Sequence, residues 1–116
     1  MNDHATIIEW TSICDIDDIV PDTGVCALLD DEQVAVFRIG AGDFYAIDNV
    51  DPVSEAAVLS RGLVGSLTER IVVASPIHKQ HFDLRTGECL EAPEYSVRTW
   101  QVRRQGSTLQ IRRGDA

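Results

Sequence analysis

The stretch Ala74-Ser-Pro-Ile-His-Lys-Gln-His-Phe-Asp-Leu-Arg-Thr-Gly-Glu88 decides the fold of this chain. An apolar run, Arg70-Ile-Val-Val-Ala74, leads into it, and Thr86-Gly87-Glu88 turns the chain after it. The branched apolar residues of the first run are typical of a buried strand, and Pro76 ends that strand. Phe82-Asp83-Leu84 has the length of a short second strand. The pattern therefore predicts a strand, a loop, a short strand and a turn in succession.

Short strand patterns separated by turn residues also fill the rest of the chain. Val25–Leu29 and Gln33–Ile39 flank Asp30-Asp31-Glu32, which predicts a tight hairpin. Strands spaced roughly 8–12 residues apart favour an antiparallel sandwich or barrel, so the expected class is all-β with at most very short helices. The remaining predicted strands are Glu9–Cys14 (Trp10 and Ile13 facing the core), Phe44–Asp48, Tyr95–Arg103 and Thr108–Arg112.

The 116 residues are expected to form a single domain, with a core at about 9–112 and a loose leader at 1–8. No apolar run is long enough to cross a bilayer, and the first residues lack the basic and apolar regions of a secretory signal. We therefore expect a cytoplasmic protein without a membrane partner. Three distant cysteines without a C-x-x-C pair are expected to be buried or half-buried small side chains: Cys14, Cys26 and Cys89.

The net charge of −9 is unevenly distributed along the chain. Residues 1–58 contain 13 acidic and one basic side chain, whereas residues 59–116 contain 6 acidic and 9 basic ones. An acidic first half argues against nucleic-acid binding, which requires Lys and Arg to displace counterions. The acidic half is either a solvated face that aids solubility or a docking face for a basic partner.

The segment Asn49-Val-Asp-Pro-Val-Ser-Glu-Ala-Ala-Val-Leu-Ser-Arg-Gly-Leu-Val-Gly65 interrupts the strand pattern. Asp51 and Pro52 start a turn, and Ser54 with Glu55 is expected to cap a short helical turn that reaches Leu59. A loop of this length in so small a domain is usually functional, so this segment and the loop after Ala74 are the candidate functional segments.

From about Trp10 to Ile111 the order of elements resembles the Rieske ferredoxin domain. In that family, a Cys-x-His loop and a Cys-x-x-His loop hold a [2Fe–2S] cluster through two thiolates and two imidazoles. The matching positions of this chain are Asp51 and Val53 in the first loop and Ser75 and His78 in the second. Only His78 keeps a ligand. The resemblance therefore implies the Rieske-like fold with degenerate ligand positions and without a cluster or metal.

The blocks Asp48–Gly65 and Val72–Pro93 are similar to a narrower family, the small subunits of bacterial assimilatory NADH-dependent nitrite reductase. The long run N-V-D-P-V-S-E-A-A-V-L-S-R-G carries most of this resemblance. It implies a non-catalytic accessory subunit that binds a large subunit. That large subunit would carry FAD, a [4Fe–4S] cluster and sirohaem, and would reduce nitrite to ammonium. No catalytic or cofactor-binding residue is then expected on this chain.

Two loops without a cluster would leave many apolar side chains in connecting segments. The apolar residues concerned are Val50, Pro52, Val53, Val58, Leu59, Pro76 and Ile77. Such patches mark interfaces, although the two loops could equally pack against each other. Lys79, the only lysine, lies near Arg85 and either meets an acidic partner surface or is solvated. The predicted partner interface comprises Val50, Pro52, Val53, Pro76, Ile77, His78 and Lys79.

Two alternative functions remain open from the sequence. The first is a Rieske-type [2Fe–2S] electron-transfer protein, which the degenerate ligand positions oppose. The second is a metal-dependent enzyme that uses His78 and His81, which are three residues apart. Zinc sites in proteins need three or four ligands, and no further ligand is evident near these two.

Overall fold

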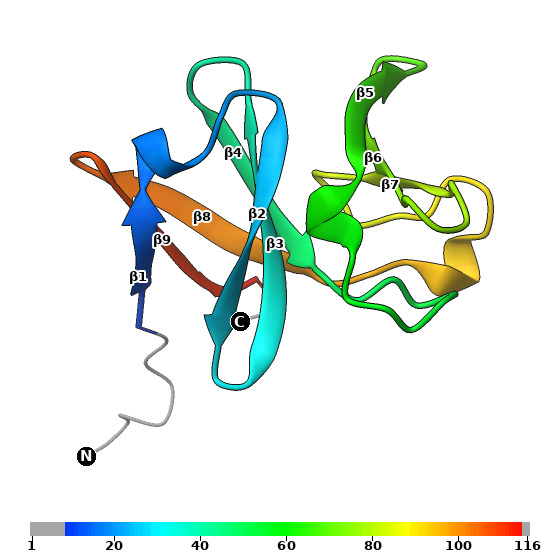
Figure 1. Ribbon diagram of the computed structural model, residues 1–116, viewed down its shortest axis with the longest axis horizontal. Helices are drawn as coiled ribbons and strands as arrows, with labels where there is room; N and C mark the ends of the chain where they lie inside the picture. The colour runs from blue at the N-terminus through cyan, green and yellow to red at the C-terminus, as the bar shows by residue number, and fades with distance from the viewer. Residues whose placement is uncertain (1–8, 115–116) are drawn as a thin grey trace.

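Nine strands in two antiparallel sheets and three short 3₁₀ helices make up residues 9–114, the part of the chain that this computed structural model describes (Figure 1). The six-stranded sheet contains, in spatial order, β1 (Thr11–Asp15), β9 (Thr108–Arg113), β8 (Thr99–Gln105), β4 (Asp43–Asp48), β3 (Glu32–Ile39) and β2 (Thr23–Leu29). The three-stranded sheet contains β5 (Leu63–Leu67), β6 (Arg70–Ala74) and β7 (His81–Asp83). The 3₁₀ helices are η2 (Ile16–Asp18), η3 (Leu59–Arg61) and η4 (Pro93–Tyr95). The all-β prediction is confirmed.

The hairpin that joins β2 to β3 turns through two residues. Asp30 and Asp31 have φ values of 51° and 70°, the left-handed conformation at both central positions that matches the twist of a two-residue hairpin. Asp tolerates this conformation better than most residues do, because its short polar side chain bonds locally. The predicted hairpin is therefore confirmed, with Glu32 as the first residue of β3 rather than as part of the turn.

Strand β3 is buried on both of its faces, and this organises the core. Val34 and Val36 face one cluster, whereas Ala35 and Phe37 face the other, because successive side chains of a strand point to opposite sides. One cluster lies inside the curved six-stranded sheet and also contains Ile19, Ala46, Trp100, Leu109 and Ile111. The other joins the two sheets and also contains Ile47, Leu59, Val73, Phe82, Leu84 and Cys89.

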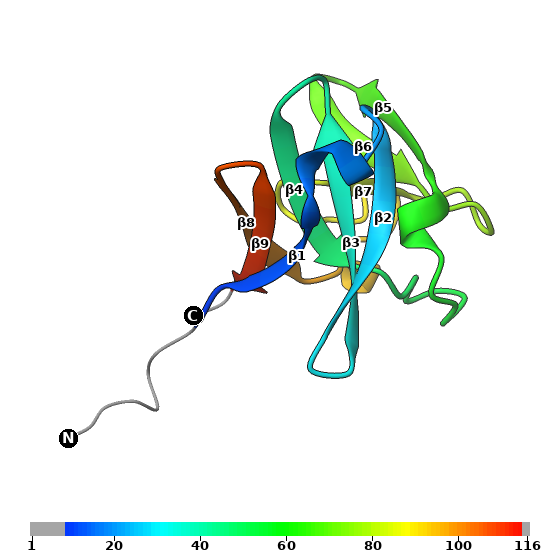
Figure 2. The same cartoon turned by 60° about the vertical axis from the view of Figure 1, so that its left-hand side comes forward.

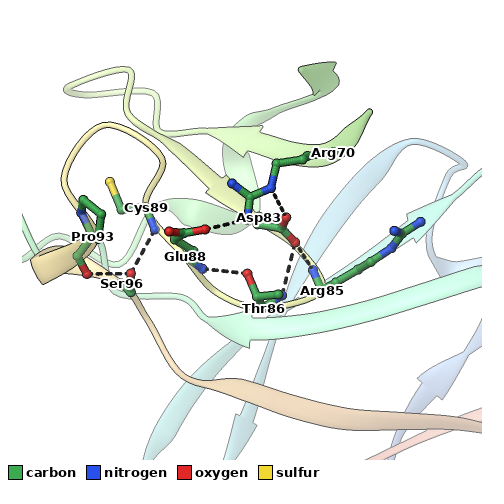
Figure 3. A network of polar contacts seen from close by, with 8 residues as sticks. All are labelled: Arg70, Asp83, Arg85, Thr86, Glu88, Cys89, Pro93 and Ser96. Carbon is green, nitrogen blue, oxygen red and sulfur yellow. Dashed lines mark hydrogen bonds and ion pairs between the residues drawn. The ribbon is translucent and has the colours of Figure 1, made fainter. Parts of the chain in front are cut away.

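The predicted succession of strand, loop, short strand and turn around Ala74–Glu88 is confirmed by β6, β7 and the turn after them. An ion-pair network holds this turn (Figure 3). Arg70 Nε donates to Asp83 Oδ2 at 2.8 Å, and Arg70 Nη2 donates to Glu88 Oε1 at 2.5 Å. The other oxygen of Asp83 accepts from the Arg85 and Thr86 amides at 2.7 and 3.1 Å. The nearly buried Asp83 therefore fixes both the strand and the turn that follows it.

Two predictions about strands were wrong. The strand expected at Tyr95–Arg103 begins only at Thr99, because Pro93–Tyr95 form η4, whose backbone bonds are local. Trp10 does not face the core. It is half-buried and lies beneath Arg103 and Arg112, whereas Ile13 does pack against the core as expected.

Two further corrections concern the segment 49–65. Its last residues belong to β5, which was not predicted. The helical turn expected after Ser54 does not form: Glu55 is left-handed, with φ 63°, and the short helix starts instead at Leu59 without a side-chain cap. Of the cysteines, Cys89 is buried and Cys14 half-buried as expected, but Cys26 is exposed. None of the helices within residues 9–114 is long and apolar enough to cross a membrane.

Candidate functional site

Two loops carry the degenerate ligand positions. The first, residues 49–58, follows β4, and the second, residues 75–80, joins β6 to β7. We call them the paired loops. Both lie at the end of the molecule that contains the small sheet, away from β1 and β9 (Figure 1). The cluster-binding geometry that the sequence resembles would require these loops to meet, and they do.

The first of the paired loops is folded around Asp51, whose side chain is fully buried. Its Oδ1 accepts hydrogen bonds from the Val53 amide at 2.9 Å and from the Ser54 amide at 3.4 Å. The Asp51 carbonyl accepts from the Glu55 amide at 2.6 Å. An Asp at the start of a turn commonly bonds its own backbone two residues on, and here that bond closes a compact five-residue turn.

The second of the paired loops repeats this arrangement with Ser75 in place of Asp51. Ser75 Oγ accepts from the Ile77 amide at 3.3 Å, and the Ser75 carbonyl accepts from the Lys79 amide at 3.0 Å. Lys79 ends the turn in the left-handed conformation with φ 65°, as Glu55 does in the first loop with φ 63°. Each loop is therefore a five-residue turn that begins at a buried acceptor and ends at a left-handed residue.

A direct hydrogen bond joins the two loops at their first residues. Ser75 Oγ donates to Asp51 Oδ2 at 2.5 Å, and both side chains are buried. Burial acts to raise the pKa of the Asp51 carboxyl, but the hydrogen bonds from the Ser75 hydroxyl and from the Val53 and Ser54 amides together lower this pKa below its ordinary value. Asp51 is therefore ionised at neutral pH. The bond from Ser75 is charge-assisted, which makes it stronger than a bond between neutral groups.

The residues at this end do not fit a [2Fe–2S] cluster. Asp51 and Ser75 stand at the two thiolate positions and are bonded directly to each other, and Val53 has no lone pair to offer. His78, the one remaining ligand type, has an exposed side chain. Within residues 9–114 no group of three or more His, Cys, Asp or Glu side chains is placed to hold a metal ion.

The predicted interface residues are on the surface of the paired loops. Val50 and Ile77 are 41% and 46% exposed, and Pro76, His78 and Lys79 are exposed as well. Pro52 and Val53 are half-buried. Leu59, which was not in the predicted interface but was expected among the apolar side chains that the loops present, lies in the core that joins the sheets. The loops also contact each other through Asp51 and Ser75, as the second interpretation expects, and the partner interface stays a prediction.

His81 has a partner that the sequence did not indicate. Its Nδ1 lies 2.6 Å from Glu91 Oε2, and its amide donates to Glu91 Oε1 at 2.8 Å. Burial acts to raise the pKa of Glu91, but these bonds from His81 outweigh it and lower the pKa. His81 is therefore held by a carboxylate, and His78 lies in the loop before it.

Asn49 is a second residue that the sequence did not single out. It is 1% exposed, and its Oδ1 accepts from the Ser60 amide at 2.7 Å. Its Nδ2 donates to Gln33 Oε1 at 3.1 Å. Asn49 therefore ties the start of the first loop to both β3 and η3. The available signal was its place directly after a strand, where Asn commonly starts a turn.

Known proteins resemble the chain in both sequence and fold. The family described as a Rieske-like [2Fe-2S] domain matches residues 9–112. The nitrite reductase (NADH) small subunit of Escherichia coli strain K12 is 49% identical over 105 residues, which are 90% of this chain and 97% of that protein. The chain belongs to the nitrite reductase small-subunit family. The small-subunit interpretation is therefore supported, and the Rieske electron-transfer alternative is not.

Two solved structures show which folds this chain is similar to. The NMR structure of the E. coli protein NirD has a TM-score of 0.87 at 46% identity and covers 94% of this chain and 100% of that one. The ferredoxin of carbazole 1,9a-dioxygenase from Nocardioides aromaticivorans IC177 has a TM-score of 0.76 at 27% identity, covering 88% and 95%. The small-subunit fold is thus close to that of a ferredoxin.

A longer protein also contains a segment similar to this small subunit. The protein named nitrite reductase [NAD(P)H] large subunit in Klebsiella oxytoca is 45% identical over 94 residues. These residues are 81% of this chain but 10% of that protein. In K. oxytoca, a domain of the small-subunit type is therefore part of a larger chain.

Proposed function

We propose that this chain is the accessory subunit of an NADH-dependent nitrite reductase and that it binds the large subunit through the paired loops. Its relatives are named as small subunits, and in K. oxytoca the similar segment belongs to a protein named as the large subunit. A domain that is covalently part of the large subunit in one organism is expected to bind the separate large subunit in another.

The single observation that carries this proposal is the hydrogen bond between Ser75 and Asp51. It occupies the positions from which thiolates would hold iron, so the loops keep their mutual position without a cluster. Loops that are already fixed present a defined surface, so less conformational entropy is lost when a partner binds to them. The surface combines exposed Val50 and Ile77 with the positive charge of Lys79, a composition suited to a protein interface.

In this proposal the chemistry belongs to the partner. The large subunit would hold FAD, a [4Fe–4S] cluster and sirohaem, and the reduction of nitrite to ammonium would take place there. This chain would contribute neither a cofactor nor a catalytic residue, and the complex would be cytoplasmic. The misfit of the cluster positions to iron is what supports this division of labour, because the remaining role of the domain is recognition.

The first test replaces Ile77, the more exposed of the two large apolar residues Val50 and Ile77, and the charge of Lys79 close to it. We expect Ile77→Ser and Lys79→Glu each to weaken binding to the purified large subunit by about tenfold or more, as substitutions at interface centres often do. Leu28→Ser is the matched control, because Leu28 is 68% exposed but lies on β2. Equal binding by all three variants would place the interface elsewhere on the domain.

The second test asks whether the partner exists in the cell. The wild-type chain is used for affinity capture from its own cells grown on nitrite, and the absorbance spectrum of the eluate is recorded. Flavin and sirohaem bands with a large co-eluting chain are expected. A colourless eluate without such a chain would reject the proposed function.

A further inference from the structure

Three stacked side chains come from Trp10, the residue before β1, from Arg103 on β8 and from Arg112 on β9. Strands β1 and β9 and the turn that joins β8 to β9 lie on the side of the molecule away from the paired loops (Figures 1 and 2). The guanidinium carbons of Arg103 and Arg112 each lie 4.4 Å from the centre of the Trp10 ring. We call the surface formed by Trp10, Arg103 and Arg112 the Trp10 face. Arg103 is exposed, and Arg112 and Trp10 are half-buried. The face is therefore accessible, and it is not part of the site described above.

Both arginines of the Trp10 face are held in position by neutral partners. Arg103 Nε donates to Gln110 Oε1 at 2.6 Å, and Arg112 Nε donates to Gln101 Oε1 at 2.7 Å. In the described part of the chain these are the only side-chain hydrogen bonds that the two guanidinium groups make. Each arginine thus keeps its terminal nitrogens for other acceptors, on a side chain already ordered by a ring and an amide.

Among the residues that the structure describes, neither arginine is paired with a carboxylate, although the chain carries 19 acidic residues. Arg38, Arg70, Arg98 and Arg113 all lie within salt-bridge distance of Asp or Glu. Within residues 9–114, Arg103 and Arg112 make no such pair. Arg61, Arg85 and Arg104 make no salt bridge among the described residues either, so what distinguishes Arg103 and Arg112 is that both lie on the same tryptophan ring.

We propose that the Trp10 face is a second docking surface, which binds carboxylates on an acidic surface of the large subunit. The inference rests on the proposed function. The guanidinium group presents a planar fork that matches a carboxylate in a two-point contact, and stacking on an aromatic ring reduces the entropy lost when that contact forms. Trp and Arg are also the residues most enriched among those that dominate binding energies at protein interfaces.

The location of this face makes it complementary to the paired loops rather than an extension of them. The molecule is 46 Å long, and the two surfaces lie toward its opposite ends. Two separated contacts on one rigid domain fix its orientation on a partner, and the second contact forms at a high effective concentration once the first is made. The charged Trp10 face would mainly accelerate encounter, while the apolar loops would mainly slow dissociation.

The test compares two neighbouring arginines that receive the same charge change. Arg103→Glu alters the Trp10 face. Arg104→Glu is the matched control, because successive side chains of β8 point to opposite sides and Arg104 Nε donates to the Gly106 carbonyl at 3.0 Å. Association of each folded variant with the intact large subunit is followed by surface plasmon resonance, and circular dichroism verifies the fold. At about 50 mM NaCl we expect Arg103→Glu to lower the association rate constant about tenfold, and Arg104→Glu less than about twofold.

A change of salt concentration and a charge-conserving variant distinguish a specific contact of the two arginines from a general effect of charge. The effect of Arg103→Glu should shrink at about 300 mM NaCl, where screening is stronger. Arg103→Lys combined with Arg112→Lys keeps the charge but not the fork, and should recover only part of the affinity. Equal losses for Arg103→Glu and Arg104→Glu would overturn the proposal in favour of a general charge effect.

The remaining outcomes distinguish this inference from the function on which it rests. Unchanged binding by Arg103→Glu, with the loop variant Ile77→Ser impaired, would overturn the second surface and leave the proposed function intact. No binding by the wild-type chain would reject both. Binding of a duplex DNA fragment by the wild type but not by Arg103→Glu would overturn a protein partner in favour of phosphates, which the overall charge of −9 disfavours.

Discussion

The Ser75 hydroxyl and the Asp51 carboxylate form a donor and acceptor pair that joins two loops without a metal ion. The ionised carboxylate only accepts hydrogen bonds, and the serine hydroxyl supplies one of its donors while itself accepting from the Ile77 amide. Both groups are buried, and within the described residues the bond between them is the one hydrogen bond that Asp51 Oδ2 and the Ser75 hydroxyl hydrogen make. The paired loops therefore keep their mutual position through a bond made of two ordinary side chains.

Removal of the Ser75 hydroxyl should expose this dependence. Ser75→Ala leaves a buried carboxylate without one of its donors, and we expect the free energy of unfolding to fall by about 2 kcal/mol, the usual scale for a hydrogen bond to a charged group. Urea denaturation of both proteins measures the difference. Ser66→Ala, at an exposed position of β5, is the control and should change stability by less than about 0.5 kcal/mol. A Ser75→Ala variant as stable as its control would contradict this account.

The sequence placed Asp51 and Ser75 at equivalent positions but could not predict their bond. The two residues are 24 positions apart, and their contact depends on how β4 and β6 bring the loops together. The same holds for His81 and Glu91, which meet only across the turn after β7. Exposure at Ile77 and Lys79 was predictable, because Pro76 and the polar residues around it mark a surface loop.

At the scale of single elements, the turn after β7 depends on Gly87. This residue has φ +80°, and a Cβ built on it would lie 2.1 Å from the Val97 carbonyl oxygen. The close approach is required because the Val97 amide donates to the Gly87 carbonyl at 2.8 Å. Position 87 therefore requires glycine for two reasons: its backbone is left-handed, and a Cβ would collide with the Val97 carbonyl.

A pair of glycine substitutions separates these two requirements. Gly106 also has a positive φ, +66°, but a Cβ added there would have no other atom within 4 Å. We expect Gly106→Ala to cost about 1–2 kcal/mol, the strain of the left-handed conformation alone. Gly87→Ala should cost more than about 3 kcal/mol, because the chain must also move apart. Thermal denaturation of both variants provides the comparison, and equal losses would show that steric crowding at Gly87 is unimportant.

The elements that the sequence predicted are those with strong local signals. Strand β6 has a run of buried branched residues, and the β2–β3 hairpin has two Asp residues that accept left-handed conformations. Strand β5 was missed because Leu63-Val-Gly-Ser-Leu67 contains Gly and Ser and is mostly exposed, so only its pairing with β6 makes it a strand. The late start of β8 reflects the bonds of Ser96 to Cys89 and Pro93, which no local pattern reveals.

At the scale of the whole molecule, three carboxyl groups make the free energy of unfolding depend on pH in the acidic range. Hydrogen bonds from Arg98 and Arg113 lower the pKa of Glu32, and the pKa values of Asp51 and Glu91 are lowered as described above. Arg98 also binds Asp48 at 3.0 Å, so the Glu32 network connects β3 and β4 to the segment before β8. The three groups lie in different parts of the fold, so protonation affects the molecule as a whole.

This arrangement sets the sign of the pH dependence. A carboxyl whose pKa is lower in the folded state contributes stability above its unfolded pKa of about 4, and loses it as the pH falls through the folded value. We expect these groups to leave the free energy of unfolding unchanged between about pH 5 and pH 7 and to reduce it steeply below about pH 4. The measurement is chemical denaturation from neutral to acidic pH. A Glu32→Gln/Asp51→Asn/Glu91→Gln variant should show a shallower decline, and an identical decline would assign the acid sensitivity to other groups.

The pairing of β1 with β9 brings the first and last strands of the fold together, with Thr11 opposite Ile111, on the side of the molecule away from the paired loops. A domain built in this way can be joined to a longer polypeptide at either flank while the paired loops remain uncovered. The K. oxytoca large subunit, which contains such a domain within its own chain, is consistent with gene fusion in this family. Covalent linkage and non-covalent binding would then be two ways in which evolution keeps this domain next to the large subunit.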